Sequence, residues 1–265
     1  MSPSLTDYWW TARSLLDGSR VSIEQEVAVS RQEDLAPYLD LHQAQRILDL
    51  ANGRMRPQYS LLRAGGHQVL GIDLANLPGR TLTDYSYRLA RWLYSRHVPN
   101  GRKVNVACSL VCGDVGQLPF RDVYFDLVTS MSAFEHFLDV PRVVSELSRV
   151  LRPGGLLWVR IHPFTCLSGG HNLSFTEIPL RHLPPGVDAW DHLRQRNLPF
   201  TVPLNEWRLD QYLEVFRNHF IILKHYCAVQ EGMELLTPEI EAELSDYTRE
   251  ELTCCTYAIV ARKTV

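Results

Sequence analysis

The stretch RILDLANGRMRPQYSLLRAGGHQVLGID, residues 46–73, decides the fold. It holds two short apolar runs, and the segment between them begins with Pro57 and ends with a pair of glycines. Proline is favoured in the first turn of a helix and glycine just beyond its end. The pattern therefore predicts a strand, a helix and a second strand that ends at Asp73. Such a β–α–β unit builds parallel sheets, whose ligands bind at the carboxyl ends of the strands.

An acidic residue accompanies each strand of this unit. Asp49 lies in the first strand and Asp73 ends the second. A carboxylate at the tip of the second strand is the usual partner of a nucleotide ribose. The unit by itself therefore favours a nucleotide-type cofactor.

The alternation of strand and helix continues along the chain. Apolar runs predict further strands that end near Asp114, over 125–131 and over 156–161. An apolar stripe at helical spacing predicts a helix over 141–151, which an Arg-Pro-Gly-Gly turn stops. From His162 to Asn205 the pattern dissolves into a segment rich in proline and histidine, which predicts an insertion over the rim of the sheet.

The remaining residues complete the sheet. Asn205 is the predicted N-cap of a helix that contains Trp207 and Tyr212. Apolar runs over 220–229 and 253–263 predict two last strands, which can pair antiparallel at the sheet edge, with a short helix near 238–244 between them. Before the first strand, two apolar faces predict N-terminal helices. They comprise Leu5, Tyr8, Trp9, Leu15 and Leu16, and then Leu35, Tyr38, Leu39 and Leu41.

The predicted fold is a doubly wound, mostly parallel, seven-stranded Rossmann-like α/β sheet with an antiparallel edge strand. The whole chain, residues 1–265, forms one domain. Its expected parts are an N-terminal helical cap (1–45), a cofactor-binding core (46–161), a substrate-side insertion (162–205) and the C-terminal part of the sheet (206–265).

The composition narrows the class of protein. The chain has 27 lysine and arginine residues against 30 acidic residues, without a basic run, so no nucleic-acid partner is expected. The N-terminus lacks a charged segment followed by an apolar one, and no apolar run is long enough to span a bilayer. We therefore expect a cytoplasmic protein without a membrane partner.

Cysteine and histidine spacing gives no metal signal. None of the six cysteines forms a C-x-x-C pair, and the ten histidines include no H-E-x-x-H motif. Buried thiols are the expected state of the cysteines, and no metal site is expected.

Residues 113–159, GDVGQLPFRDVYFDLVTSMSAFEHFLDVPRVVSELSRVLRPGGLLWV, carry several short motifs in order: an acidic residue, LPF, FDLV, EH and LRPGG. In this order and spacing the run closely resembles the class I S-adenosylmethionine-dependent methyltransferases. The type 11-like enzymes of small-molecule or sugar pathways are the most similar branch. With residues 46–73, the resemblance covers about residues 46–161.

The resemblance implies S-adenosylmethionine as the cofactor, and it assigns roles to matching residues. Asp49 and Gly53 would lie beside the methionine part, Asp73 would accept hydrogen bonds from the ribose, and Asp114 would accept one from the adenine amino group. Val115 would lie close to the adenine ring, and Ser130 and Met131 would border the transferred methyl group. The implied cofactor-binding residues are Asp49, Ala51, Gly53, Asp73, Leu74, Asp114, Val115, Ser130 and Met131.

The first loop departs from the family pattern D/E-x-G-x-G-x-G. Ala51 and Met55 stand where that pattern has glycine, and only Gly53 is kept. Glycine permits positive φ angles and leaves room for a ligand against the backbone. Two outcomes stay open: Gly53 keeps the critical contact, or cofactor binding is lost.

Methyl transfer is an in-line displacement that depends mainly on positioning. A general base is needed only where the acceptor carries a proton, and it contributes ~10²–10⁴-fold. His171, in the loop beyond the fifth strand, is slightly favoured as the base over His136 of the EH motif, and His162 is third. A structural role for each of these histidines stays open.

The acceptor is expected to be a small molecule. Residues 129–132, after the fourth strand, lack the Asn/Asp-Pro-Pro-aromatic pattern of many family members that methylate nucleic acids or proteins. Methylation at oxygen is favoured, with nitrogen and carbon left open. The loop 162–171 and the run Asn205 to Arg208 are similar to methyltransferases in sugar pathways, so a sugar or a secondary metabolite is the expected kind of acceptor.

Two other hypotheses remain. Ala51 and Met55 fit a cofactor-binding but non-methylating regulatory or scaffolding relative. A dinucleotide-dependent oxidoreductase is disfavoured, because no G-x-G-x-x-G follows the first strand. A homodimer is compatible with either reading.

Overall fold

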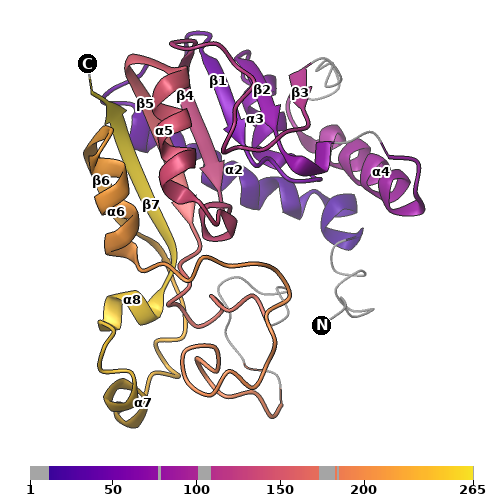
Figure 1. Cartoon of the computed structure of the whole chain (residues 1–265). Coiled ribbons are helices and arrows are strands. Elements are labelled where there is room, and N and C mark those ends of the chain that lie inside the picture. Colours follow the sequence, from indigo (N-terminus) through magenta and orange to yellow (C-terminus); the bar gives the residue numbers. More distant parts are fainter. Residues whose placement is uncertain (1–11, 77–78, 101–108, 173–182, 184, 265) are drawn as a thin grey trace.

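The computed structural model describes residues 12–76, 79–100, 109–172, 183 and 185–264. Its centre is a seven-stranded sheet with the strand order β3-β2-β1-β4-β5-β7-β6 (Figure 1). The strands are β1 (Arg46–Leu50), β2 (Gln68–Ile72), β3 (Leu110–Val111), β4 (Phe125–Met131), β5 (Leu151–Ile161), β6 (Phe220–Gln230) and β7 (Cys254–Lys263). The predicted α/β sheet is confirmed.

Strands β3, β2, β1, β4 and β5 are parallel, and β7 runs antiparallel to both of its neighbours, β5 and β6. The antiparallel strand therefore lies one place in from the edge, and β6 is the edge strand. The predicted third strand is longer than β3, but its part at 104–108 lies outside the described residues.

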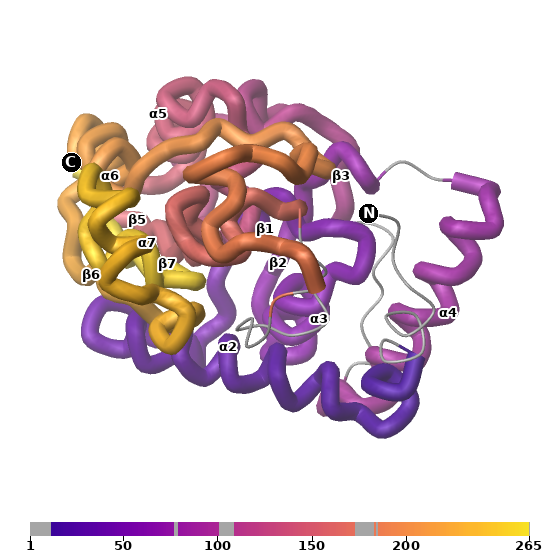
Figure 2. Tube along the Cα trace, turned by 90° about the horizontal axis from the view of Figure 1, so that it is seen from below, coloured from indigo at the N-terminus to yellow at the C-terminus, as the bar shows by residue number. Residues whose placement is uncertain are grey.

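Helices cover both faces of the sheet. Helices α2 and α3 lie on one face, and α5 and α6 lie on the other (Figure 2). The helices are α2 (Ser19–Leu35), α3 (Pro57–Ala64), α4 (Leu82–His97), α5 (Val140–Val150), α6 (Leu209–Arg217), α7 (Pro238–Glu243) and α8 (Arg249–Thr253), with short 3₁₀ helices η1 (Leu74–Asn76) and η4 (Phe134–His136).

The core follows from the alternation of side chains along the strands. In β5, Leu156 and Trp158 belong to the apolar core on the α3 side. Leu157 and Val159, which alternate with them, belong to the core on the α5 side. Both faces of the central strands are therefore buried, as in other parallel sheets that carry helices on two sides.

The β–α–β unit forms as its sequence predicts. Pro57 lies in the first turn of α3, and the helix ends at Gly65, which is followed by Gly66 with φ +89°. The chain then enters β2, which pairs with β1 residue by residue from Arg46 and Gln68 onward. Because the two strands are parallel, their carboxyl ends reach the same edge of the sheet.

The N-terminal prediction is only partly correct. Leu5, Tyr8 and Trp9 lie outside the described residues. The helix predicted at the second apolar face is wrong, because α2 ends at Leu35 and the chain continues in a turn through Tyr38.

Helix α2 has no clear apolar stripe in its sequence, because polar side chains anchor it to the sheet. Its buried Asp34 carboxylate accepts hydrogen bonds from Trp158 Nε1 at 3.0 Å, Lys224 Nζ at 2.7 Å and Tyr226 Oη at 2.9 Å. These partners belong to β5 and β6, so Asp34 fixes α2 across the sheet.

Helix α6 begins later than predicted. Its N-cap is Arg208, and Asn205 and Trp207 precede the helix. The side chain of Asn205 does not cap α6, because it is engaged by the η4 turn described below. The helix expected at 238–244 forms as α7, and α8 was not predicted.

Asp126 is a structural residue that holds two strands together. Burial acts to raise its pKa, but hydrogen bonds from Arg46 and the charge of Arg152 lower the pKa overall. Arg152 comes from the LRPGG motif, so that motif ties β5 to the amino ends of β1 and β4.

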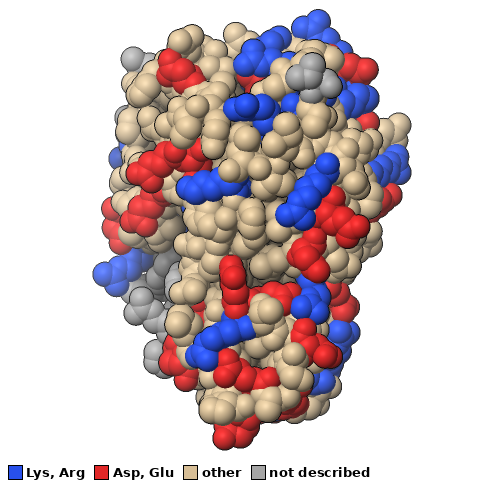
Figure 3. Space-filling view, turned by 90° about the vertical axis from the view of Figure 1, so that its left-hand side faces the viewer, with Lys and Arg blue, Asp and Glu red and all other residues tan. Residues whose placement is uncertain are grey.

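The surface carries charges of both signs. On the side that lies to the left in Figure 1, basic and acidic side chains are interspersed (Figure 3). No helix among the described residues is both long and apolar enough to cross a bilayer.

Candidate active site

The site lies at the carboxyl edge of the parallel strands. The loops after β1, β2 and β4 meet there, and the described parts of the insertion, 162–172 and 185–205, lie beyond that edge (Figures 1 and 2). This is the edge at which the sequence predicts that the cofactor and the acceptor bind.

Residues 51–56 form the first loop, which follows β1. Ala51, Gly53 and Arg56 have φ angles of +51°, +64° and +56°. Positive φ is costly for residues other than glycine. Ala51 nevertheless has the backbone conformation that the glycine of the family pattern would favour at this position. The Ala51 amide donates to Ile72 O at 2.8 Å, which fixes the loop against β2.

Gly53 and Met55 explain why the altered loop keeps its shape. A Cβ atom added at Gly53 would meet nothing within 4 Å, so the backbone there faces open space. Met55 instead packs against the apolar cluster of α2 and α4 that includes Val21 and Tyr94. The larger residue thus points into protein, and the glycine that is kept is the one beside the open space.

Asp49 lies at the base of this loop and is 5% exposed. Burial raises its pKa to about 7, although the hydrogen bond from Thr129 Oγ1 at 3.0 Å and the charge of Arg31 act in the opposite direction. When this buried carboxylate is ionised, Thr129 and Arg31 offset only part of the cost of burying its charge. It suits a cationic group of a ligand, such as the ammonium of an amino acid.

Asp73 links the first loop to the end of β2. Its Oδ2 accepts from the Gly53 amide at 2.8 Å, and its Oδ1 accepts from the Ala75 amide at 2.6 Å. Each carboxylate oxygen can accept a second hydrogen bond. Leu74, the next predicted residue, is 70% exposed at the rim.

The other predicted cofactor residues follow β3 and β4. Asp114 is exposed, and its Oδ1 accepts from the Gly116 amide at 2.8 Å, while Val115 packs partly against the sheet core. Ser130 is buried, and its hydroxyl donates to Leu50 O at 3.3 Å. Met131 packs partly against the α3-side core.

The predicted cofactor residues lie at one edge of the sheet. The open space at Gly53, the buried Asp49 and the exposed Asp114 lie along one edge, and Asp73 stands between the loops. This donor and acceptor set fits S-adenosylmethionine, which carries an ammonium group, a ribose and an adenine amino group.

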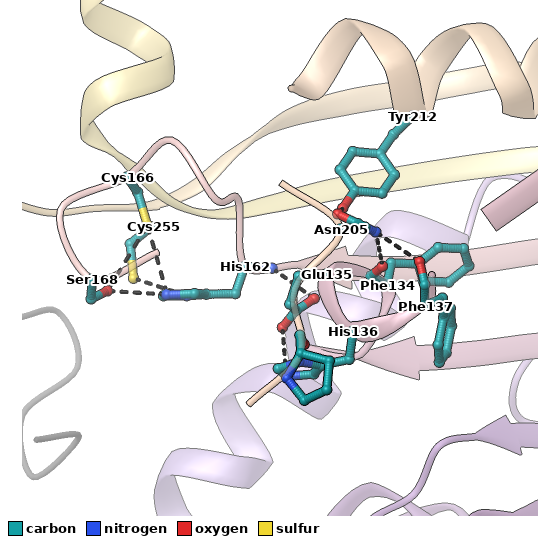
Figure 4. Close-up of polar contacts among 11 residues, drawn as sticks. Phe134, Glu135, His136, Phe137, His162, Cys166, Ser168, Asn205, Tyr212 and Cys255 are labelled. Atoms are coloured by element: carbon teal, nitrogen blue, oxygen red, sulfur yellow. Dashed lines mark hydrogen bonds and ion pairs between the residues drawn. The ribbon is translucent and has the colours of Figure 1, made fainter. Parts of the chain in front are cut away.

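A second part of the site is η4, the 3₁₀ turn after β4. Asn205 Nδ2 donates to the carbonyls of Phe134 at 2.7 Å and Phe137 at 3.0 Å, and its amide donates to Glu135 O at 2.9 Å (Figure 4). The Tyr212 hydroxyl in turn donates to Asn205 Oδ1 at 2.9 Å. The end of the insertion therefore braces the turn that presents Glu135 and His136.

His136 has a defined tautomer. Its Nδ1 lies 3.0 Å from Pro203 O, and a carbonyl can only accept, so Nδ1 donates and Nε2 carries the lone pair when the ring is neutral (Figure 4). Nε2 lies 4.0 Å from Oε1 of Glu135, a carboxylate that is 1% exposed. Burial raises the pKa of Glu135.

The predicted bases His171 and His136 come together. Their ring centroids are 4.8 Å apart, and His171 lies 5.0 Å from His162, both edge to face. We call Glu135, His136, His162 and His171 the histidine cluster. Burial, followed by the charges of His162 and His136, lowers the pKa of His171 to about 3, so this imidazole is neutral and a weak proton acceptor near pH 7.

His162 also belongs to a separate buried group. Its Nε2 lies 3.1 Å from Ser168 Oγ, and its Nδ1 lies 3.8 Å from Cys255 Sγ (Figure 4). Ser168 donates to Glu231 Oε1 at 2.6 Å, and Cys166 Sγ lies 3.7 Å from His162 Nε2. This group joins the insertion to β7 beneath the surface.

Sequence reasoning missed Glu135, Pro203 and Asn205 as site residues. Glu135 stood inside the EH motif, which was the available signal. Asn205 belonged to the run 205–208 that resembles methyltransferases of sugar pathways, but no local pattern showed its contact with η4. Pro203 had no signal, because it also acts on a residue more than sixty positions away.

Comparisons with known proteins agree with this geometry. Residues 48–159 match a family described as a methyltransferase domain. The chain is 30% identical over 160 residues to the demethylmenaquinone methyltransferase of Streptomyces avermitilis, covering 60% of this chain and 59% of that protein. It is 29% identical over 133 residues to the 27-O-demethylrifamycin SV methyltransferase of Amycolatopsis mediterranei, covering 50% of this chain and 44% of that protein. The chain therefore spans about half the length of these curated relatives.

Solved structures share the fold. A protein of Pyrococcus horikoshii OT3 matches with a TM-score of 0.52 and 20% identity, over 89% of this chain and 91% of that one. A [4+2]-cyclase matches with a TM-score of 0.51 and 20% identity, over 91% and 82%. Residues 48–159 therefore match a methyltransferase domain by sequence, and the solved structures show that the chain shares their fold.

Proposed function

We propose that the chain transfers a methyl group from S-adenosylmethionine to a hydroxyl group of a small molecule. The observation that carries this proposal is His136: a hydrogen bond from Nδ1 to Pro203 O leaves the lone pair on Nε2, five residues beyond the end of β4. That position adjoins Ser130 and Met131, which border the methyl group in the family. The two curated relatives named above carry small molecules in their names, which supports the acceptor class.

Residues at the ends of β1, β2 and β3 would bind the cofactor, and η4 would act on the acceptor. Asp49 and the backbone at Gly53 hold the methionine part, Asp73 holds the ribose, and Asp114 holds the adenine. When bound, S-adenosylmethionine supplies a methyl group on a sulfonium, and the sulfur leaves with the electron pair of the carbon–sulfur bond as the acceptor oxygen bonds to the methyl carbon. Nε2 of His136 takes the proton of the acceptor hydroxyl, and η4 holds that nitrogen in place.

Substrate identity beyond this class is also a proposal. A sugar or a secondary metabolite fits an acceptor-side insertion that contributes both polar and aromatic groups. His171, the base favoured from sequence, would pack beside His136 and orient it, because the rings are 4.8 Å apart and meet edge to face.

The test has two stages. Calorimetry should show binding of S-adenosylmethionine and of its demethylated product to the purified chain. Incubation with labelled cofactor and a panel of hydroxylated small molecules should then yield a labelled acceptor in extractable, low-mass material. Label found only in carbon-linked or nitrogen-linked products would overturn the assignment to oxygen.

The rival is a cofactor-binding relative that does not methylate. It is favoured by one observation, the strained Ala51 in the first loop, and the same fold occurs in a structure titled as a [4+2]-cyclase. Cofactor binding without turnover of any acceptor, in a protein whose His136 is intact, would support it.

Three further expectations stay predictions from sequence. They are a cytoplasmic location, the absence of a nucleic-acid partner, and the pairing of two copies in a homodimer. Sedimentation at several protein concentrations would test the last of them.

A further inference from the structure

The geometry points to a divalent transition-metal site formed by Glu135, His136 and His171. One ligand atom of each residue lies within 4.8 Å of the other two. Two imidazoles and one carboxylate form a known ligand set for catalytic zinc and for iron(II), and it leaves coordination positions open. These residues have no local metal-binding spacing in the sequence, because they come from η4 and from the insertion.

The arrangement of lone pairs supports a cation at this point. Nε2 of His136 and Oε1 of Glu135 are both acceptors when the imidazole is neutral and the carboxylate is ionised, and they face each other at 4.0 Å. Oε1 is buried and has no hydrogen-bond partner among the residues that the structure describes. Buried acceptors of this kind are costly unless a proton or a cation joins them.

The surroundings of the ligands match those of metal-binding histidines. Such histidines usually donate the second ring nitrogen to a carbonyl or carboxylate, which fixes the ring and the tautomer. His136 does so with Pro203 O at 3.0 Å. His171 is held at φ +49°, an uncommon backbone conformation that often occurs at functional sites.

The ligand atoms are somewhat too far apart for a bound ion. Atoms about 2.1 Å from a tetrahedral ion lie about 3.4 Å from one another, so the side chains would have to move inward by roughly 1 Å. The partly exposed His136 side chain, at 34%, has room for that movement. The buried Glu135 would remain the fixed member.

The chemistry rests on the proposed function. A cation at the open end of the acceptor side would bind the oxygen of the acceptor hydroxyl and lower its pKa, which promotes loss of the proton before methyl transfer. A nitrogen that coordinates a cation cannot accept a proton at the same time. His136 therefore takes the acceptor proton, as proposed above, only in the protein without metal; with the cation bound it is a ligand, and the proton leaves to solvent.

The test measures metal binding alone, so its result does not depend on methyl transfer. The full chain is stripped with a chelator and titrated with Zn²⁺ by calorimetry and with Co²⁺ in a visible spectrometer, without cofactor or acceptor. We expect one Zn²⁺ per chain and the d–d absorption of coordinated Co²⁺. His136→Gln and Glu135→Gln should each weaken Zn²⁺ binding at least tenfold.

A matched control separates this site from the buried group. Cys166→Ser changes the other set of ligands that lies close together, His162, Cys166 and Glu231, and should leave Zn²⁺ affinity unchanged. Thermal unfolding of each variant without metal checks its fold, and the partly exposed His136 makes its variant the safer one. Absence of Zn²⁺ binding, unchanged affinity in His136→Gln, or loss of affinity in Cys166→Ser would each overturn the proposal.

Discussion

The first loop and the histidine cluster show two different ways in which this chain builds a site. The first loop consists of six consecutive residues, and its shape depends on the φ angles at three of them. The histidine cluster gathers side chains from η4, from the end of β5 and from the insertion, and Asn205 and Pro203 brace it. A substitution in the loop should therefore change the affinity for the cofactor, whereas a substitution in the cluster should change the rate of methyl transfer to the acceptor.

The variant His136→Gln gives the strongest test of whether the two parts of the site have separate roles. Loss of the nitrogen lone pair should lower turnover by ~10²-fold, because general base catalysis contributes at least that much, and cofactor affinity should change less than about twofold. Steady-state kinetics with labelled cofactor and calorimetry measure the two quantities. His42→Gln, an exposed histidine before β1, is the control and should be neutral. Equal losses of turnover and cofactor affinity would show that the two parts are not separate.

Asp73→Asn tests the opposite side of the division. Both carboxylate oxygens accept hydrogen bonds from backbone amides and would also accept them from the ribose hydroxyls. The loss of charge should therefore weaken cofactor binding by roughly 10–100-fold. Calorimetry with the demethylated cofactor measures this without turnover. Asp122→Asn, whose side chain is 69% exposed and pairs with Arg149, is the matched control. If both variants bind equally well, Asp73 does not hold the ribose.

The sequence was sufficient for the fold because its signals were local. Apolar runs, Pro57, the glycines that end α3 and the ordered motifs of residues 113–159 each describe a few neighbouring residues, and the strands formed where these signals lay. Helix α2 was misplaced because its anchor, Asp34, is a buried polar residue with partners in β5 and β6.

The candidate site could be predicted only in part. Asp49, Gly53 and Asp73 lie together at one edge of the sheet, as predicted, because each is at or near the end of a strand and parallel strands bring their ends together; their roles toward a cofactor stay predictions. Asn205 looked like an N-cap, but its side chain bonds the carbonyls of η4, and no local pattern could show that. The gathering of the histidine cluster depends on the path of the insertion, which lacks a periodic pattern.

The pH dependence of cofactor binding would sharpen the role of the first loop. Burial raises the pKa of Asp49 to about 7, and a cationic group of the cofactor needs the ionised form. Affinity should therefore rise roughly tenfold between pH 6 and pH 8, with proton release on binding near pH 6. Calorimetry in buffers of different ionisation enthalpy measures both.

Asp49→Asn should remove this dependence. The raised pKa also means that ionisation destabilises the free protein as pH rises from about 4 through 7, since the folded state holds the proton more tightly than the unfolded state. The variant should therefore unfold at a higher temperature than the natural chain at pH 8, and the difference should shrink toward pH 4. A flat affinity profile in the natural chain would place the cationic group elsewhere.

The smallest expected effect is that of Ala51→Gly, and it tests whether the first loop is strained rather than merely different. Alanine at φ +51° costs about 1 kcal/mol relative to glycine, although glycine gains freedom in the unfolded chain, so the free energy of unfolding should rise by up to about 1 kcal/mol. Ala90→Gly, within helix α4, is the matched control and should lower that free energy by about 1 kcal/mol. Urea unfolding measures both, and two losses of similar size would show that the loop accommodates Ala51 without strain.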